Sequence, residues 1–390
     1  MLWCWVIAGP GALLALGSLH GERRRAAYVK ARLSASAGAL PPATVIVPVK
    51  GEDEGLRENL AALASLDYPD YELIVVAQSA NDIPAGVLPR QVKVVLAHGG
   101  SPQASEKVRN LAAAVDAARQ ASAVYAFADS DARVTAGWLR ALAAPLDEPG
   151  VGASTGFRWF MPSPAGLWSL LRAVWDGTSL GVLGPGDNPF AWGGAMAIRK
   201  DVFFAAGVPE CWRTAISDDY ALSDAVHRAG LRIAFTPGAL APSPEPITAR
   251  RFFAWSRRQL LLTRVYSPKL WRAALAAHVV YCASMVAAAA AWLHGSAVAP
   301  WLLAAQLLPG MAKGLGRVRL ARAALPNHAP WFRRWGWTHT LLVPIATWLW
   351  LAALLSSAFG SSIEWRGRRY RLRGCPVERD SGGSSSKIYD

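Results

Sequence analysis

Asp129 and Asp131 have the clearest chemical implication of any residues in this sequence. They end the apolar segment VYAFADSDARV (124–134), which is typical of a buried strand that stops abruptly at charged side chains. Side chains two positions apart in an extended segment point the same way, so both carboxylates are aimed at one place. There they favour a Mg²⁺ or Mn²⁺ ion that leaves most of its coordination shell to a phosphate-bearing ligand. The alternative is a turn capped by two acids, without a metal.

A second acidic pair, Asp218 and Asp219, begins an amphipathic helix that leads into a strand in ISDDYALSDAVHRAGLRIAF (216–235). One acid at this position is explained as a helix cap that interacts favourably with the helix dipole. A second adjacent carboxylate is not required for capping. It is therefore a candidate general base near a metal-bound leaving group.

The segment RRFFAWSRRQLLLTR (250–264) has helical spacing, with aromatic residues on one face and arginines on another. One interpretation is an amphipathic helix that lies on lipid headgroups. The other is that an arginine of this helix binds a diphosphate. Both interpretations remain open from the sequence.

A scaffold must bring these side chains together, and the segment between residues 43 and 245 has the pattern of one. Short apolar runs alternate with helical stretches, which predicts a largely parallel sheet with helices on both faces. Lys50, Gln78 and Asp129 follow predicted strands directly, at the edge where such sheets bind ligands. The predicted strands are 44–49, 72–77, 92–97 and 124–129, and the predicted helices are 54–66 and 105–121.

Apolar segments at both ends of the chain predict membrane helices. Residues 2–19 are apolar and are followed by Arg23–Arg25, an order that favours an uncleaved anchor with its basic end in the cytoplasm. Residues 273–293 and 338–359 are long enough to span a bilayer, whereas 297–312 is short enough to be re-entrant. Arginines on both sides of the last segment leave the final topology open.

These patterns predict five regions. They are an N-terminal transmembrane anchor (1–22), a cytoplasmic catalytic domain (40–250), an amphipathic interfacial segment (250–270), C-terminal membrane helices (271–360) and a basic, partly disordered tail (361–390).

The composition agrees with a membrane protein and excludes other classes. Of the 390 residues, 53% are hydrophobic and only 17% are charged, yet the net charge is +14. The arginines cluster beside apolar segments, which favours an anionic membrane surface as their partner over a nucleic acid. The four cysteines and seven histidines have no ligand spacing and predict neither a disulfide framework nor a zinc site.

Five ordered segments resemble those of the family 2 inverting glycosyltransferases of GT-A fold, and among them the membrane-bound ceramide glucosyltransferases. The similarity extends over roughly residues 40–270. The resemblance implies a GT-A catalytic domain, a Rossmann-like mixed sheet with helices on both faces, joined to transmembrane helices. The segments are PVKGEDEGLRENL (48–60), SEKVRNL (105–111), FADSDARV (127–134), WGGAMAIRKDVF (192–203) and ISDDYAL (216–222).

The resemblance also implies roles for individual residues. Asp129 and Asp131 are expected to hold the Mn²⁺ or Mg²⁺ ion, and Asp219 is expected to be the catalytic base. The residues expected to bind the nucleotide sugar are Pro48, Lys50, Glu52, Ser79, Asp82, Lys107, Asp129, Arg258 and Gln259. The residues expected to bind the acceptor are Trp192, Gly193, Gly194, Asp218 and Trp175, although core packing is the default explanation for Trp175.

Two positions depart from the pattern of these relatives. Ser79 stands where they have an aspartate near the nucleobase, whereas Asp82 is kept. In the motif that the relatives share near the membrane, Arg258 is kept but Gln259 replaces a tryptophan. These replacements leave the identity of the donor's nucleobase open.

The expected protein is thus a multi-pass enzyme of the cell inner membrane. It would transfer a sugar from a nucleotide sugar (UDP-glucose, UDP-galactose or UDP-glucuronate) to a lipid hydroxyl, with ceramide as the favoured acceptor. A hopanoid, diacylglycerol or polyprenyl phosphate are alternative acceptors. A catalytically silent GT-A domain that serves as a membrane scaffold is the alternative from another class.

Overall fold

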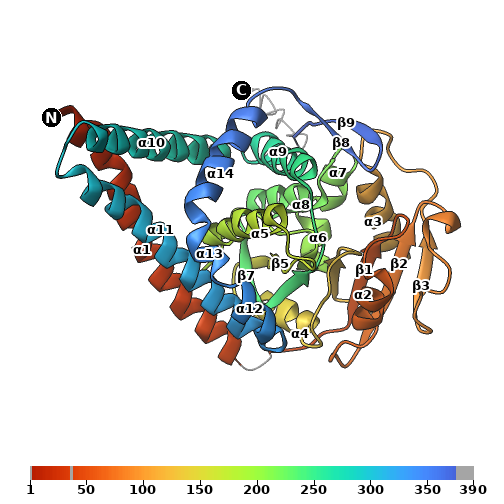
Figure 1. Cartoon of the computed structure of the whole chain (residues 1–390). Coiled ribbons are helices and arrows are strands. Elements are labelled where there is room, and N and C mark those ends of the chain that lie inside the picture. Colours follow the sequence, from red (N-terminus) through yellow and green to blue (C-terminus); the bar gives the residue numbers. More distant parts are fainter. Residues whose placement is uncertain (1, 36–37, 375–390) are drawn as a thin grey trace, which may run out of the picture.

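A seven-stranded sheet with helices on both faces forms the centre of the chain in the computed structural model, which describes residues 2–35 and 38–374 (Figure 1). The strand order is β3-β2-β1-β4-β6-β5-β7. The prediction of a mixed α/β fold is therefore confirmed. The strands are β1 (Ala43–Pro48), β2 (Tyr71–Ala77), β3 (Lys93–Leu96), β4 (Val124–Ala128), β5 (Val151–Phe160), β6 (Ala195–Arg199) and β7 (Arg232–Ser243).

The helices follow the strands in the first half of the domain and dominate the last third of the chain. They are α1 (Leu2–Ser34), α2 (Leu56–Leu63), α3 (Glu106–Ala117), α4 (Trp138–Ala143), α5 (Leu167–Ser179), α6 (Lys200–Ala205), α7 (Val208–Trp212), α8 (Asp218–Arg228), α9 (Ala249–Tyr266), α10 (Pro268–Leu293), α11 (Ala299–Ala324), α12 (Ala329–Trp335), α13 (Thr338–Leu341) and α14 (Val343–Ser357).

The first four strands run parallel to one another. Parallel neighbours require crossover connections between them, and the segments between these strands supply the connections. Their bounds match the four strands expected from the sequence to within two residues. Strand β6 then pairs antiparallel with both β4 and β5, which makes the sheet mixed. The ends of β1, β2 and β4 consequently meet at one edge, where the chemically informative residues follow them.

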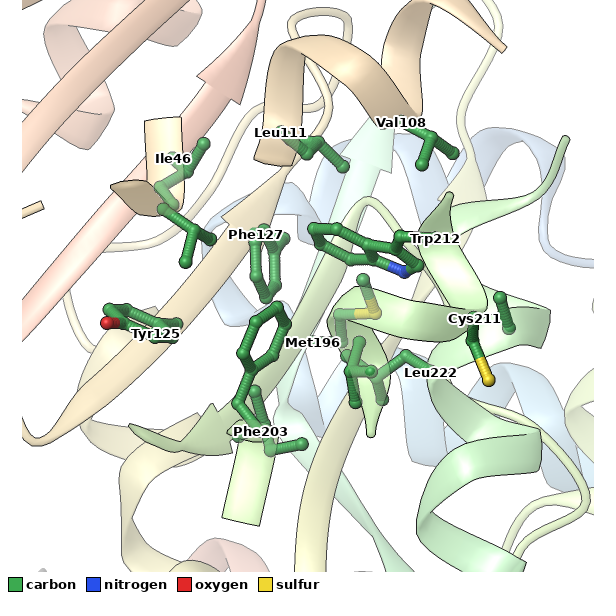
Figure 2. Close-up of a cluster of buried hydrophobic side chains, with 14 of the residues drawn as sticks. Ile46, Val108, Leu111, Tyr125, Phe127, Met196, Phe203, Cys211, Trp212 and Leu222 are labelled. Carbon is green, nitrogen blue, oxygen red and sulfur yellow. The ribbon is translucent and has the colours of Figure 1, made fainter. Parts of the chain in front are cut away.

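Alternation along the central strands fills two separate cores, one on each face of the sheet. Ile46 and Phe127 point to the face covered by α3, α6, α7 and α8, where Phe127 packs edge-on against Trp212 at 5.6 Å (Figure 2). Val45 and Ala126, one position away, point to the face covered by α2 and α4. Each fully buried large side chain stabilises the domain by about 1.5–3 kcal/mol, so the edge that carries the site is rigidly supported.

Four long helices, from both ends of the chain, lie together beside the sheet domain. Helices α1 and α11 run side by side, α10 crosses to them at their far end, and α14 connects this group to the domain (Figure 1). Among the described residues, α10 is the one helix long and apolar enough to cross a membrane, and α14 is a shorter apolar helix. A multi-pass arrangement thus stays a prediction.

The basic segment after α14 forms a small hairpin of strands β8 (Ser362–Trp365) and β9 (Arg368–Arg371) against the sheet domain (Figure 1). The sequence patterns had assigned these arginines to a membrane surface. Arg366 and Arg368 instead form ion pairs with Asp53 and Glu106 of the domain. The prediction of disorder for 381–390 lies outside the described residues.

Candidate active site

The two carboxylates after β4 converge on one point, as their spacing predicts. Nη2 of Arg158 lies 3.0 Å from Oδ2 of Asp129 and 3.0 Å from Oδ1 of Asp131. Burial raises the pKa of Asp131, against the opposing effect of Arg158. Burial also acts on Asp129, but Lys107 and Arg158 outweigh it and lower the pKa of that carboxyl.

This geometry fits a divalent metal that is held by few protein ligands. The two carboxylates already share one cationic group, so they are placed to share a metal ion. No cluster of three or more histidine, cysteine or acidic side chains suitable for a metal occurs in the described part of the chain. Asp129 and Asp131 would therefore hold Mg²⁺ or Mn²⁺ through hard oxygen atoms and leave the other positions to a ligand and water.

Lys107 connects the metal motif to the second acidic pair. Its Nζ lies 2.9 Å from Oδ1 of Asp129 and 3.1 Å from Oδ1 of Asp218. Helix α3 places this lysine, and Ser105 caps the helix by accepting a hydrogen bond from the N–H of Val108 at 3.3 Å. The two acidic motifs, about 90 residues apart in the sequence, thus form one network of alternating charge.

The two acids at the start of α8 lie in different environments. Asp218 is fully buried, and burial raises its pKa to about 6, with Lys107 acting against and Asp219 adding to this shift. Asp219 lies at the cavity, and its carboxylate accepts hydrogen bonds from Ser217 Oγ at 2.5 Å and from the N–H of Tyr220 at 2.7 Å. Asp219 is therefore the carboxylate that is both oriented and accessible to a ligand.

Two glycines let the backbone approach these carboxylates. The N–H of Gly193 donates to Oδ2 of Asp219 at 3.1 Å. A Cβ on Gly193 would lie 2.6 Å from Oδ2 of Asp218, and one on Gly194 would lie 2.7 Å from Oδ2 of Asp129. Both positions thus require glycine because a larger residue would displace a carboxylate. This contact explains why the sequence WGG precedes β6.

One cavity of about 880 Å³ contains the site and extends to the group of helices α1, α10, α11 and α14. Its residues come from the sheet edge, from α8 and α9, and also from α1, α10, α11 and α14. The expected site residues that line it are Pro48, Lys50, Lys107, Asp129, Asp131, Trp175, Trp192, Asp218, Asp219, Arg258 and Gln259. The structure therefore places most of the predicted residues around one void.

Aromatic side chains line much of this cavity. Trp175 of α5 is buried and stacks on Trp350 of α14, with ring centroids 4.1 Å apart. Trp255 of α9 meets the edge of Trp175 at 5.1 Å. Trp192 lies under the guanidinium of Arg158, whose Cζ is 5.0 Å from the ring centroid. These rings give the cavity an apolar surface next to its charged end.

Three expected nucleotide-binding residues do not line this cavity. Glu52 is exposed, and its neighbour Asp53 instead accepts a hydrogen bond from Ser130 Oγ at 2.5 Å, inside the metal motif. Asp82 accepts the N–H of Ser79 at 3.0 Å and so braces its own turn. Their proposed contacts with a nucleobase stay predictions.

Arg158 and Asp176 are among the charged residues of the cavity that the sequence patterns missed. Arg158 interrupts the apolar strand β5, and this interruption was the available signal. Asp176 follows Trp175 in an apolar helix, and its Oδ2 is buried without a hydrogen-bond partner in the described part of the chain. Both residues became recognisable only when β5 and α5 were placed at the sheet edge.

A comparison with protein families decides the class of this enzyme. Residues 4–376 match the model of glycosyl transferase family 21. The chain belongs to glycosyl transferase family 21. The prediction of a glycosyltransferase is thereby confirmed, although the motifs had suggested family 2. Inversion at the sugar carbon stays a prediction.

Solved structures support the fold of this family 21 member. The chain is similar to the mannosyltransferase PcManGT from Pyrobaculum calidifontis, solved with GDP-Man and Mn²⁺. The TM-score is 0.53 at 20% identity, over 91% of this chain and 97% of that chain. Glucosyl-3-phosphoglycerate synthase from Mycobacterium tuberculosis, solved with Mn²⁺, UDP-Glc and glycerol 3-phosphate, gives 0.37 at 17% identity, over 60% and 80% of the two chains. The first similarity shows that the fold is of the GT-A type.

Proposed function

We propose that this protein is a membrane-bound, inverting glycosyltransferase that moves a hexose from a UDP-sugar to the hydroxyl group of a lipid, with ceramide as the acceptor. The class of enzyme follows from the family, which is that of the ceramide glucosyltransferases. The donor, the stereochemistry and the acceptor are the proposed parts.

The continuity of the cavity is the observation that supports a lipid acceptor. At one end are the carboxylates of Asp129, Asp131 and Asp219, and at the other are the helices α10 and α14. A soluble acceptor would need only the charged end. A lipid needs a polar site for its hydroxyl and an apolar path for its chains, and this single void offers both.

The proposed reaction follows from the position of Asp219. The acceptor oxygen forms a bond to the anomeric carbon while the bond from that carbon to the diphosphate breaks. The acceptor proton passes to a carboxylate oxygen of Asp219, and the nucleoside diphosphate leaves with the bonding electrons. Three hydrogen-bond donors hold the Asp219 carboxylate in place for this transfer.

A metal between Asp129 and Asp131 would supply positive charge where the leaving diphosphate becomes more negative. PcManGT was solved with Mn²⁺ and a nucleotide sugar, which supports a divalent metal and a nucleotide-sugar donor here. Arg258 adds a second positive group to this end of the cavity. Charge stabilisation of this kind is strong where positive groups are fixed in place before the charge develops.

The decisive experiment uses the full chain in lipid nanodiscs. Ceramide is supplied with UDP-glucose, UDP-galactose, UDP-glucuronate or GDP-mannose, in Mn²⁺ or Mg²⁺, and the lipids are analysed by mass spectrometry. A hexosylceramide made from a UDP-sugar supports the proposal. Product with only a hopanoid, diacylglycerol or polyprenyl phosphate would replace the acceptor, and no product together with no metal-dependent nucleotide binding would leave the scaffold interpretation.

The membrane position is part of the same proposal. Helix α10 alone meets the length and hydropathy expected of a span among the described residues. We expect α1, α11 and α14 to lie in or against the same bilayer, with the sheet domain in the cytoplasm at the inner membrane. Labelling of single engineered cysteines from either side of sealed vesicles tests this arrangement.

A further inference from the structure

The turn of the hairpin β8–β9 contacts Lys50, an expected nucleotide-sugar residue that follows β1. The two elements lie side by side although most of the chain separates them in the sequence. Arg366 at its turn donates a hydrogen bond to the carbonyl oxygen of Lys50 at 2.6 Å. The same guanidinium lies 2.8 and 3.0 Å from the two oxygens of Asp53. The turn of the hairpin is therefore fixed at the carboxyl end of β1, next to the metal motif.

Further contacts hold the hairpin in this position. Arg368 pairs with Glu106 at 3.1 Å and donates to Oε1 of Gln78 at 3.2 Å. Ile363 and Leu372 pack against Ile216 and Leu261 of the domain. The hairpin thus has an apolar base and a charged tip, and it is a wall of the site rather than a loose extension.

The backbone at the tip is in an unusual conformation. Trp365 pairs with Arg368, so Arg366 and Gly367 form a two-residue turn, with φ angles of 48° and 75°. This is the turn type in which both central residues need a positive φ, and glycine adopts it without strain. Arg366 is the single non-glycine residue with a positive φ among the described residues, although arginine has no preference for that conformation.

The strained turn directs two side chains into the cavity. Trp365 and Arg366 both line it, together with Asp129 and Asp131. The ring of Trp365 lies 5.8 Å from Cζ of Arg258, the arginine of α9. The hairpin and α9 therefore face the metal motif from the same side.

The charges of the site explain why this tip matters. Many carboxylates lie in or beside the cavity, among them those of Asp53, Asp129, Asp131, Asp218 and Asp219. Lys107 and Arg158 are already paired with three of them. An incoming diphosphate thus needs further positive groups. Lys50 is paired with Glu106 at 2.6 Å, and Arg258 and Arg366 are two further cations that line the cavity.

We propose that Arg366 is a donor-binding residue that pairs with the diphosphate of the nucleotide sugar, and that Trp365 and the hairpin form the wall that encloses this diphosphate. This inference rests on the proposed function, because it assumes a nucleoside diphosphate donor. It adds a C-terminal element to a site whose other donor contacts come from the sheet domain and α9. On donor binding, the guanidinium exchanges its contact with Asp53 for a contact with phosphate.

The test measures nucleotide binding by the full chain, purified in detergent with Mn²⁺, by isothermal titration calorimetry. Arg366→Ala is expected to raise the dissociation constant of UDP by about tenfold or more, because a charge-assisted pair is lost. The matched control is Arg369→Ala, because Arg369 lies in the same hairpin, is exposed, does not line the cavity, and donates side-chain hydrogen bonds to Ser362 within the hairpin. The control is expected to bind UDP within about twofold of wild type.

Competition by uridine separates diphosphate binding from a structural role. If Arg366 binds the diphosphate, Arg366→Ala weakens UDP but leaves the affinity for uridine unchanged. Equal weakening of UDP and uridine would overturn the proposal, because it would show that Arg366 only holds the hairpin in place. Unchanged UDP binding would also overturn it.

Asp131→Ala keeps this test distinct from a test of the proposed function. If wild type binds UDP and Asp131→Ala does not, the metal–diphosphate site stands, and a negative result for Arg366→Ala counts against the hairpin alone. If wild type binds neither UDP nor GDP with Mn²⁺, the proposed donor itself is wrong and this inference is wrong with it.

Discussion

At the scale of single residues, the site is organised by cations that each hold two acids. Lys107 lies between Asp129 and Asp218, and Arg158 lies between Asp129 and Asp131. Asp219 is the acid of this group that is held by neutral donors and left beside the cavity. No salt bridge engages the Asp219 carboxylate in the described part of the chain, so its oxygens stay available to accept a proton from a ligand.

Asp219→Asn tests this distinction. The amide keeps the size of the side chain but cannot accept a proton, so we expect kcat to fall by about 10²–10⁴-fold. The dissociation constant of UDP with Mn²⁺ should stay within about twofold, because the metal motif is intact. Steady-state kinetics and calorimetry on the same preparation measure both values.

Asp224→Asn is the matched control, because Asp224 lies on the same helix and forms an exposed pair with Arg228 at 3.2 Å. It should leave kcat unchanged. A loss of UDP binding in Asp219→Asn as large as the loss of kcat would contradict the assignment of Asp219 as the base.

Asp176 predicts a dependence of stability on pH. Burial raises the pKa of the Asp176 carboxyl to about 7, against the opposing effects of Arg158 and Arg172. His339 of α13 packs against the adjacent Gly177, so this part of α5 is covered. The folded state therefore binds a proton that the unfolded state has released, and this contribution to stability is lost as the pH rises from about 4 to about 7. Asp176→Asn removes the loss, so we expect its Tm to exceed that of wild type by at least about 2 °C at pH 8.

The comparison at pH 5 completes this test. At pH 5 only about a third of the loss has occurred, since the loss runs from about pH 4 to about pH 7, so the gain in Tm should be clearly smaller than at pH 8. Asp201→Asn is the control, because Asp201 is exposed and should change Tm equally at both pH values. An equal gain at pH 5 and pH 8 for Asp176→Asn would show that packing, and not ionisation, causes it.

At the scale of elements, the sequence predicted the parallel strands β1 to β4 and a strand after α8, which is β7, and it missed β5 and the antiparallel β6. Strands β1 to β4 are short apolar runs between helical stretches, and this pattern is local. Strand β5 contains Gly156, where a Cβ would lie 2.0 Å from the carbonyl oxygen of Ala239 on β7. Such a contact depends on a strand far along the chain, so no local pattern reveals it. The hairpin β8–β9 was missed because its arginines resemble a membrane-facing cluster.

The turn before β6 offers a prediction at the same scale. In Gly194→Ala, the new methyl group would meet the ring of Trp192 and Oδ2 of Asp129. We expect metal-dependent UDP binding to weaken by at least about tenfold, because the turn must move away from the metal motif. Calorimetry measures the binding, and circular dichroism checks that the fold is retained.

Gly166→Ala is the matched control for the turn variant. It lies in another loop, and a Cβ there meets nothing within 4 Å. UDP binding should be unchanged in this control. Equal binding by Gly194→Ala and wild type would show that the turn can adjust without moving Asp129.

At the scale of the whole molecule, the two ends of the chain meet to complete the cavity. Arg25 of α1 donates a hydrogen bond to the carbonyl oxygen of Leu183 at 2.6 Å, and α14 stacks Trp350 on Trp175. The donor end of the site was predictable because its residues follow strands in ordered motifs. The acceptor end was not, because it is assembled from four helices whose composition indicates only that they are apolar.

This assembly predicts that the acceptor path can be closed without harm to the donor site. Ala277 of α10 lines the cavity, whereas Ala276, one residue away, does not. Ala277→Trp places a large side chain in the path, so transfer to ceramide in nanodiscs should fall by at least about tenfold. UDP binding should remain within about twofold, because the metal motif is at the other end of the void. Ala276→Trp adds the same bulk on another face of the same helix and should retain transfer. If both variants lost transfer equally, the cause would be a disturbed helix, and the acceptor would reach Asp219 by another route.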